Sequence, residues 1–147
     1  MKLAGVHPRL IAAYHRIAFA MAELGHPIIV TDGLRTLEQQ QKLYAQGRTA
    51  KGKIVTFADG IRKKSNHQAK ADGFGYAIDC AFLLNGVPSW AESHPWRLYG
   101  AAAKSLGLKW GGDWSGLVDR PHIELPEELS ADVPSIGPDI PGGGAPA

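Results

Sequence analysis

One aspartate lies inside the apolar run YAIDCAFLL, residues 76–84, and this feature constrains the fold of the chain more than any other. An extended strand places Ile78 and Cys80 on one face and Asp79 on the other, between two alanines. Such a carboxylate needs a partner, because burying an unpaired charge is costly. The small neighbours leave room for a metal ion with further ligands. Asp79 taken alone favours a simpler alternative, an arginine partner or hydrogen bonds at a strand end, because buried charges are usually paired.

The segments around this run predict an α+β fold, a small mostly antiparallel sheet flanked by helices in a single domain. Helices are predicted at 8–24, 36–47 and 95–106, and strands at 27–31, 76–84, 108–110 and 121–125. Thr36 and Gln39 fit a capping box for the second helix, and Leu37, Leu43 and Tyr44 can supply its apolar edge. Ser93 can cap the third helix. The pair Asn85-Gly86 predicts a tight hairpin after the central strand.

The length of 147 residues fits one domain with one core. We assign residues 1–128 to the folded domain and residues 129–147, rich in proline and glycine, to a flexible tail. The single cysteine, Cys80, excludes an internal disulfide framework and is expected to be a small buried side chain. No window is apolar enough for a membrane span, and we expect no secretory signal at the N-terminus.

The net charge of +2 conceals a strong asymmetry along the chain. Residues 1–112 hold 15 Lys and Arg against 7 Asp and Glu, whereas residues 113–147 hold 1 against 7. The basic side chains crowd between Arg48 and Lys70, where they would attract an anionic polymer. Bacterial cell wall and nucleic acid both qualify, although no nucleic-acid-binding motif is recognisable. A solvated basic loop is an equally plain interpretation.

Further candidate ligands occur in a polar loop and in the segment DRPHIEL, residues 119–125. His67, Asp79 and His122 with an open fourth position would suit a catalytic zinc site. Such a site needs a nearby carboxylate that is not a ligand, to take a proton from water, and Asp119 is spaced for that role. Glu124 shares a strand face with His122 and is expected to be structural, because a fourth protein ligand would exclude water.

These residues resemble the motifs of a family of zinc peptidases, the D-alanyl-D-alanine carboxypeptidases and the L-alanyl-D-glutamate endopeptidases of bacteriophage endolysins. The family pattern has Gly-x-Arg-Thr/Ser before a glutamine-containing helix, then Ser-x-His, Gly-x-Ala-x-Asp and Asp/Glu-x-x-His. The chain matches it in order with GLRT (33–36) and Gln39, SNH (65–67), GYAID (75–79) and DRPH (119–122). The segments LAGVHPRL and WGGDW are similar to the endopeptidase branch. The resemblance covers roughly residues 3–125.

Carried over to the matching positions, the resemblance implies one zinc ion with His67, Asp79 and His122 as ligands. It makes Asp119 the general base that activates water and then protonates the leaving amine. It puts Arg35 in the place of an arginine that binds substrate and steadies the developing oxyanion, a use of fixed positive charge that fits the chemistry.

The resemblance also implies that Ser65 hydrogen-bonds the substrate or the metal shell. The implied activity is cleavage of the L-Ala–D-Glu bond of peptidoglycan peptide stems, with D,D-carboxypeptidase action on D-Ala-D-Ala as the alternative enzyme. A wall-binding module without catalysis is another alternative, against which Asp119 and the open ligand set argue. An endolysin would accumulate in the host cytoplasm and act on the wall after release. We expect a monomer.

One departure from the family pattern concerns the loop between the first two ligands. The family usually has six residues between histidine and aspartate, whereas eleven separate His67 from Asp79 here. Five extra loop residues cost little closure entropy, so both side chains can still reach one ion. The insertion could cover the site, reshape specificity or displace His67 from the metal.

Overall fold

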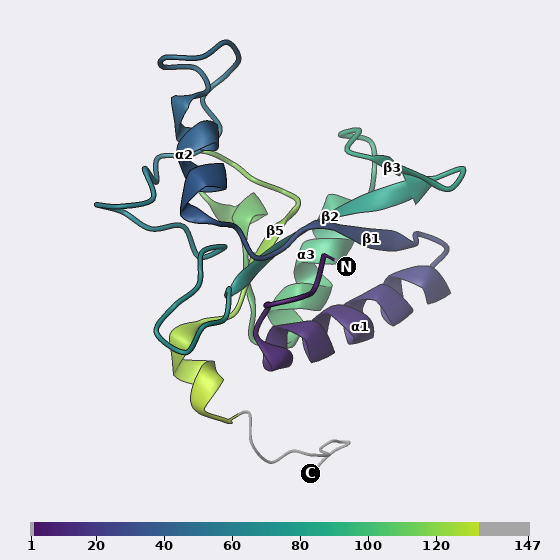
Figure 1. Ribbon diagram of the computed structural model, residues 1–147. Helices are drawn as coiled ribbons and strands as arrows, with labels where there is room; N and C mark the ends of the chain where they lie inside the picture. Colours follow the sequence, from purple (N-terminus) through teal and green to yellow (C-terminus); the bar gives the residue numbers. More distant parts are fainter. Residues whose placement is uncertain (1, 133–147) are drawn as a thin grey trace.

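The computed structural model describes residues 2–132 of the chain (Figure 1). The helices are α1 (Pro8–Glu23), α2 (Leu37–Ala45) and α3 (Trp96–Ser105). The strands are β1 (Ile28–Asp32), β2 (Ala77–Leu84), β3 (Val87–Ser89), β4 (Lys109–Trp110) and β5 (His122–Glu124). Two 3-10 helices follow β4 and β5, η1 (Gly111–Asp113) and η2 (Glu127–Asp132). Each helix and strand that the sequence predicts is present.

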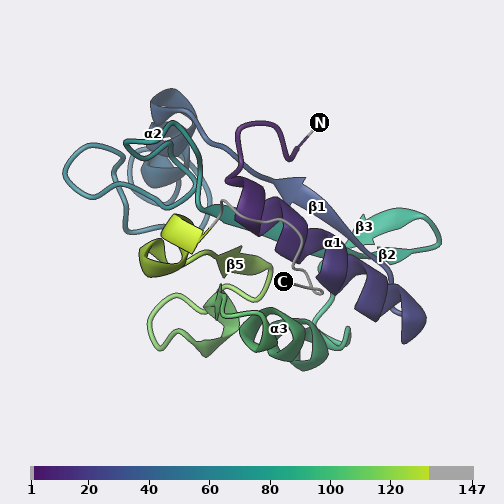
Figure 2. The ribbon, with the colours of Figure 1, turned by 90° about the horizontal axis from the view of Figure 1, so that it is seen from below.

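The strands form one sheet in the order β1-β2-β5-β4, with β3 paired to the far end of β2. Every strand pair in it is antiparallel, so the predicted α+β class with a small antiparallel sheet is confirmed. Ile78, Cys80 and Phe82 project from β2 into the hydrophobic core, which α1 and α3 cover (Figure 2). Asp79 therefore projects from the opposite face of the central strand.

The hairpin between β2 and β3 forms as predicted, because Asn85 and Gly86 both adopt positive φ, as this turn requires. The prediction that Ser93 caps α3 is wrong. The residue before the first helical turn is Pro95, and no side chain caps it. Trp96 packs in the core, whereas Trp90 is exposed.

Helix α2 lies at one end of the sheet, apart from α1 and α3 (Figure 1). Its capping box between Thr36 and Gln39 is present. The residue that α2 buries is Gln40, and the predicted apolar edge is wrong at Leu37, whose side chain is exposed. The reason is that α2 packs on a polar loop: Gln40 Nε2 donates hydrogen bonds to Ala58 O (2.8 Å) and to Thr56 Oγ1 (3.3 Å).

The predicted tail, 129–147, begins inside η2, where Leu129 packs against the core. Residues 133–147 lie outside the described residues, so their flexibility stays a prediction. Within residues 2–132, no helix is both long enough and apolar enough to cross a membrane.

Candidate metal centre

The register of the sheet brings two predicted ligands together. Asp79 in β2 lies directly opposite His122 in β5, and opposed residues on antiparallel strands have neighbouring side chains. On the other side of β2, a register shift in β1 between Val30 and Asp32 places Asp32 opposite Asp79. This irregularity turns the end of β1, and with it the loop that follows, toward the same point.

The third predicted ligand, His67, comes from the loop before β2 and is fixed by the backbone around it. Its Nδ1 lies 2.9 Å from Gly33 O, and its own carbonyl accepts a hydrogen bond from Arg35 N (2.8 Å). Ser65 Oγ accepts from His67 N (3.1 Å), which closes a tight turn at the ligand. His67 is consequently buried with its ring edge facing Asp79, despite the longer loop.

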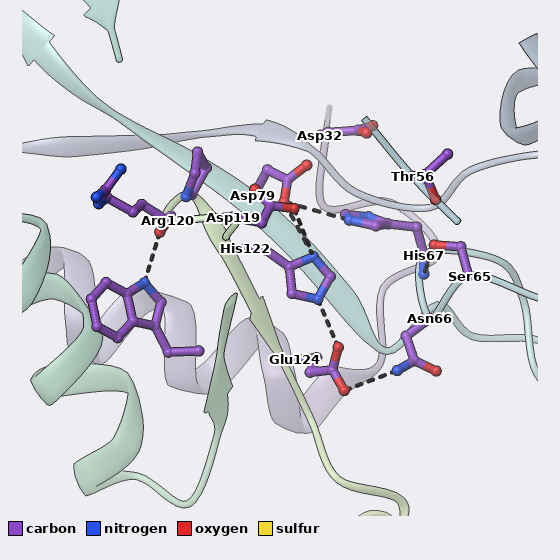
Figure 3. A network of polar contacts seen from close by, with 12 residues as sticks. Asp32, Thr56, Ser65, Asn66, His67, Asp79, Asp119, Arg120, His122 and Glu124 are labelled. Atoms are coloured by element: carbon purple, nitrogen blue, oxygen red, sulfur yellow. Dashed lines mark hydrogen bonds and ion pairs between the residues drawn. The ribbon is translucent and has the colours of Figure 1, made fainter. Parts of the chain in front are cut away.

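The three side chains offer one ligand atom each within 4.8 Å of one another (Figure 3). His67 Nε2 lies 3.5 Å and His122 Nδ1 3.4 Å from the same oxygen, Asp79 Oδ1. That oxygen is fully buried and has no hydrogen-bond partner. Ligands at the usual zinc distances in a tetrahedron lie about 3.3 Å apart, so these spacings fit a zinc ion.

The outer nitrogens of both histidines are engaged, which turns the inner nitrogens toward the site. Nδ1 of His67 donates to the Gly33 carbonyl, and Nε2 of His122 lies 2.7 Å from Glu124 Oε1. A ligand histidine typically donates its second N–H to such an acceptor, which fixes its tautomer and orientation. Glu124 thus orients His122 from outside, in agreement with the structural role expected from the sequence.

The charges of the site reinforce this donor set. Burial alone would raise the pKa of Asp79, but the neighbouring imidazoles of His122 and His67 hold it below its ordinary value. Burial alone would lower the pKa of His122, yet the carboxylates of Asp79 and Glu124 beside the ring outweigh it and raise the pKa to about 9. The carboxylate is therefore ionised and ready to bind a cation at neutral pH.

The predicted base, Asp119, lies beside the triangle formed by His67, Asp79 and His122, with Oδ2 3.9 Å from His122 Nδ1 (Figure 3). Burial, followed by the charge of Asp79, raises the pKa of Asp119 above its ordinary value, which makes it a stronger base. Its loop folds closely over Gly111, where a Cβ atom would lie 2.3 Å from Asp119 O. This close approach explains why the first glycine of WGGDW, Gly111, has no side chain.

Two core side chains hold the loop that follows Asp119. Trp110 Nε1 donates to Arg120 O (2.7 Å), and the Tyr99 hydroxyl donates to Pro121 O (2.7 Å). Both donors belong to the hydrophobic core, so the position of the base is set by rigid elements. Across Pro121, the side chains of Asp119 and His122 face the same site.

Arg35 lies at the edge of the triangle, with NH2 3.8 Å from Asp79 Oδ2. Its guanidinium donates to Asp32 Oδ2 (2.5 Å) and to Gln40 Oε1 (2.8 Å). The motif resemblance assigned Gln39 to the glutamine of the family pattern. In the structure Gln39 caps the helix, and it is Gln40 that contacts Arg35. Asp32 is not among the site residues predicted from the sequence, and its position three residues before Arg35 is the only sequence signal for the pair.

Comparison with known proteins agrees with this geometry. A family profile described as D-alanyl-D-alanine carboxypeptidase matches residues 59–125. Over 129 residues the chain is 34% identical to the peptidoglycan L-alanyl-D-glutamate endopeptidase CwlK of Bacillus subtilis, which spans 82% of this chain and 73% of CwlK. The chain belongs to the D-alanyl-D-alanine carboxypeptidase and L-alanyl-D-glutamate endopeptidase family.

Two further relatives of this family member carry the same activity in their names. An L-alanyl-D-glutamate peptidase of a Listeria phage is 42% identical over 53 residues, which span 35% of this chain and 19% of that enzyme. The crystal structure of the Serratia marcescens L-Ala D-Glu endopeptidase ChiX matches with a TM-score of 0.59 and 27% identity, over 91% of this chain and 88% of ChiX. The resemblance stated from the sequence motifs is thus confirmed.

In this family member the triangle opens into a cleft of about 880 Å³. One wall carries apolar side chains of the loop after α2 (Ile54, Val55 and Phe57), and the other carries those of the loop after η1 (Trp114, Leu117 and Val118). The Trp114 ring lies 4.7 Å from the His122 ring, so Trp114 lines the site. Trp110 and Tyr76 are buried instead. Ser65, Lys63 and Lys64 also line the cleft.

Binding of zinc should release a proton from His122, because a ligand histidine must be neutral. With the pKa of His122 raised to about 9, the metal-free site holds that proton at neutral pH. We therefore expect zinc affinity to rise with pH, by about tenfold per unit for one proton, and to level off above about pH 9. Competition with a chelator at several pH values measures this slope. An affinity independent of pH between about pH 6.5 and 8.5 would contradict it.

Proposed function

We propose that the chain is a zinc-dependent peptidoglycan endopeptidase that cleaves the L-Ala–D-Glu bond of the peptide stem. The observation that carries the proposal is Asp79 Oδ1, which is buried without a hydrogen-bond partner between a nitrogen of His67 and a nitrogen of His122. The second nitrogen of each ring is already held, by Gly33 O and by Glu124. The named activity of CwlK, the relative with 34% identity over most of the chain, supports the choice of bond.

The donor set supports one Zn²⁺ held by His67, Asp79 and His122, with a fourth position open to water. When bound, such an ion polarises the scissile carbonyl and lowers the pKa of a water molecule to about 7. Asp119 would accept a proton from the attacking water at Oδ2 and pass it to the leaving amine. Its raised pKa suits both transfers.

Arg35 supplies positive charge at the edge of the site, where it would bind a substrate oxygen or the developing oxyanion. Asp32 and Gln40 fix the guanidinium, so little reorganisation is needed when substrate arrives. Ser65 lines the same cleft and could hydrogen-bond the peptide, although its Oγ already accepts from the His67 amide.

The cleft suits a peptide stem that alternates small apolar side chains with carboxylates. Apolar residues on both walls, such as Val55 and Val118, offer contacts for alanine side chains. Lys63 and Lys64 at the rim, together with Arg35, offer charge for the carboxylate of D-Glu. Peptide stems are therefore the proposed partners of this cleft.

Digestion of purified cell wall tests the proposal. Mass spectrometry of the products should show new N-terminal D-Glu and stems shortened after L-Ala, and the reaction should stop when zinc is chelated. Release of free D-alanine as the only product would assign the chain to the alternative D,D-carboxypeptidase activity, the description carried by the matching family profile. Binding to wall without any cleavage would assign it to a wall-binding module.

An endolysin role follows if the chain acts during phage lysis, as the similarity to the Listeria phage enzyme over 53 residues supports. In that role the protein would accumulate in the host cytoplasm and reach the wall after release. Lysis from within, on expression together with a separate pore-forming protein, is the measurement that checks it. The monomeric state stays a prediction.

A further inference from the structure

The segment between His67 and Asp79 folds into an ordered turn. Lys70 N donates to Phe74 O (2.9 Å), and Gly73 N donates to Lys70 O (2.8 Å). Phe74 is half-buried against the hydrophobic core, which anchors the far side of the turn. None of residues 69–75 lines the catalytic cleft, so the segment does not cover the site. Any effect of this segment on the metal centre is therefore exerted from outside the cleft.

The side chain of Lys70 connects this turn to the metal-binding loop. Its Nζ donates to Asn66 Oδ1 (2.8 Å), pairs with Glu127 at 3.1 Å and lies 5.2 Å from the centre of the Tyr76 ring. The side chain is only 26% exposed, an unusual degree of burial for a lysine. Its ammonium group therefore has defined neighbours on several sides.

From Asn66 the polar contacts continue to the proposed ligand His122. Asn66 Nδ2 donates to Glu124 Oε2 (2.9 Å), and Glu124 Oε1 accepts from His122 Nε2 (2.7 Å), as Figure 3 shows. A lysine can only donate, so Lys70 selects the orientation of the Asn66 amide that presents oxygen to it. In that orientation the amide nitrogen faces Glu124, which leaves the carboxylate free to accept from His122.

We propose that Lys70 is a positioning residue for the metal centre, acting through Asn66 and Glu124 on the ring of His122. The proposal rests on the zinc site of the proposed function. Without Lys70, the Asn66 amide can turn over and present its oxygen to Glu124, which repels the carboxylate. Glu124 then holds the His122 ring and its tautomer less firmly, and outer-shell partners of this kind contribute strongly to metal affinity.

The test is the zinc dissociation constant of Lys70→Met, measured by competition with a chelator. Loss of an outer-shell partner weakens metal binding by about 10- to 100-fold, so Asn66→Ala should lose about tenfold and Lys70→Met, one contact further out, about three- to tenfold. Lys70→Arg keeps a cationic donor and should retain the wild-type affinity within about twofold. If Lys70→Met does not fold, Lys70→Gln, too short to reach Asn66 as Lys70 does, carries the same expectation.

Two comparisons separate positioning from simple packing. Glu127→Gln removes the ion-pair partner of Lys70. The Glu127 side chain is 74% exposed, and this variant should leave zinc affinity unchanged. The double variant Lys70→Met/Asn66→Ala should bind zinc no more weakly than Asn66→Ala alone, because both changes break one path. Additive losses, an equal loss in Glu127→Gln, or wild-type affinity in Lys70→Met would each overturn the proposal. If the wild-type protein itself binds no zinc, the proposed function fails instead.

Discussion

Replacing Asp119 with asparagine should lower the rate of peptide hydrolysis by about 10²- to 10⁴-fold while the zinc content stays unchanged. Asparagine keeps the shape of the side chain but cannot accept a proton from water. Asp119 is not among the three clustered ligands, and its Oδ2 lies 3.9 Å from His122 Nδ1, so the metal site should survive the change. Single-turnover cleavage of a purified stem peptide, with metal analysis of the same sample, measures both effects.

A matched control is Asp113→Asn, which alters a carboxylate at the end of η1, before the loop of Asp119. Asp113 pairs with Lys104 at the surface. This control should leave hydrolysis unchanged. Stability provides a second check. Because burial beside Asp79 raises the pKa of Asp119, its ionised form is disfavoured in the metal-free fold, and neutral asparagine should unfold at an equal or higher temperature. Undiminished hydrolysis by Asp119→Asn would place the base elsewhere.

The fold was largely predictable because its elements carry strong local signals. The alternation in YAIDCAFLL, the capping box at Thr36 and the pair Asn85-Gly86 each specify structure within a few residues. The errors occurred where a distant partner decides the outcome. Gln40 is buried because the loop at Thr56 and Ala58 supplies its hydrogen bonds, and periodicity along α2 contains no record of that loop.

The sequence motifs identified the side chains of the candidate site, but not the strand geometry that brings them together. The residues His67, Asp79 and His122 are chemically suited to zinc wherever they occur, whereas their meeting depends on the register between β2 and β5. Register follows from the packing of whole strands, so it cannot be read from either segment alone. The same limit hid Asp32, which the shift in β1 places opposite Asp79.

The outer partners were still less accessible to sequence. Asn66 lies inside the Ser-x-His motif as the variable residue, and Lys70 lies in the inserted segment. Neither position has a distinguishing signal, and their connection to His122 runs across three segments. The structure therefore adds most for the longer loop. The loop leaves His67 facing Asp79 and adds the hydrogen bond from Lys70 to Asn66.

Replacing His67 with alanine should abolish tight zinc binding and, with it, peptide hydrolysis. His67 Nε2 is one of three protein donors around the site, and removal of a direct ligand should cost more than the roughly 100-fold upper range seen for outer-shell partners. The purified variant should contain almost no zinc after dialysis against a weak chelator. His15→Ala, which removes an exposed histidine of α1, is the matched control and should keep both zinc and activity.

This variant also decides what the inserted segment does. If His67→Ala retained zinc with wild-type affinity, the longer loop would have removed His67 from the metal in solution, and another donor would have to complete the site. If His67→Ala and Asp79→Ala lose zinc equally, both ends of the loop hold the same ion. We expect the second result, because the buried Asp79 carboxylate is flanked by two imidazole nitrogens at 3.4 and 3.5 Å, and a cation placed there would contact all three side chains.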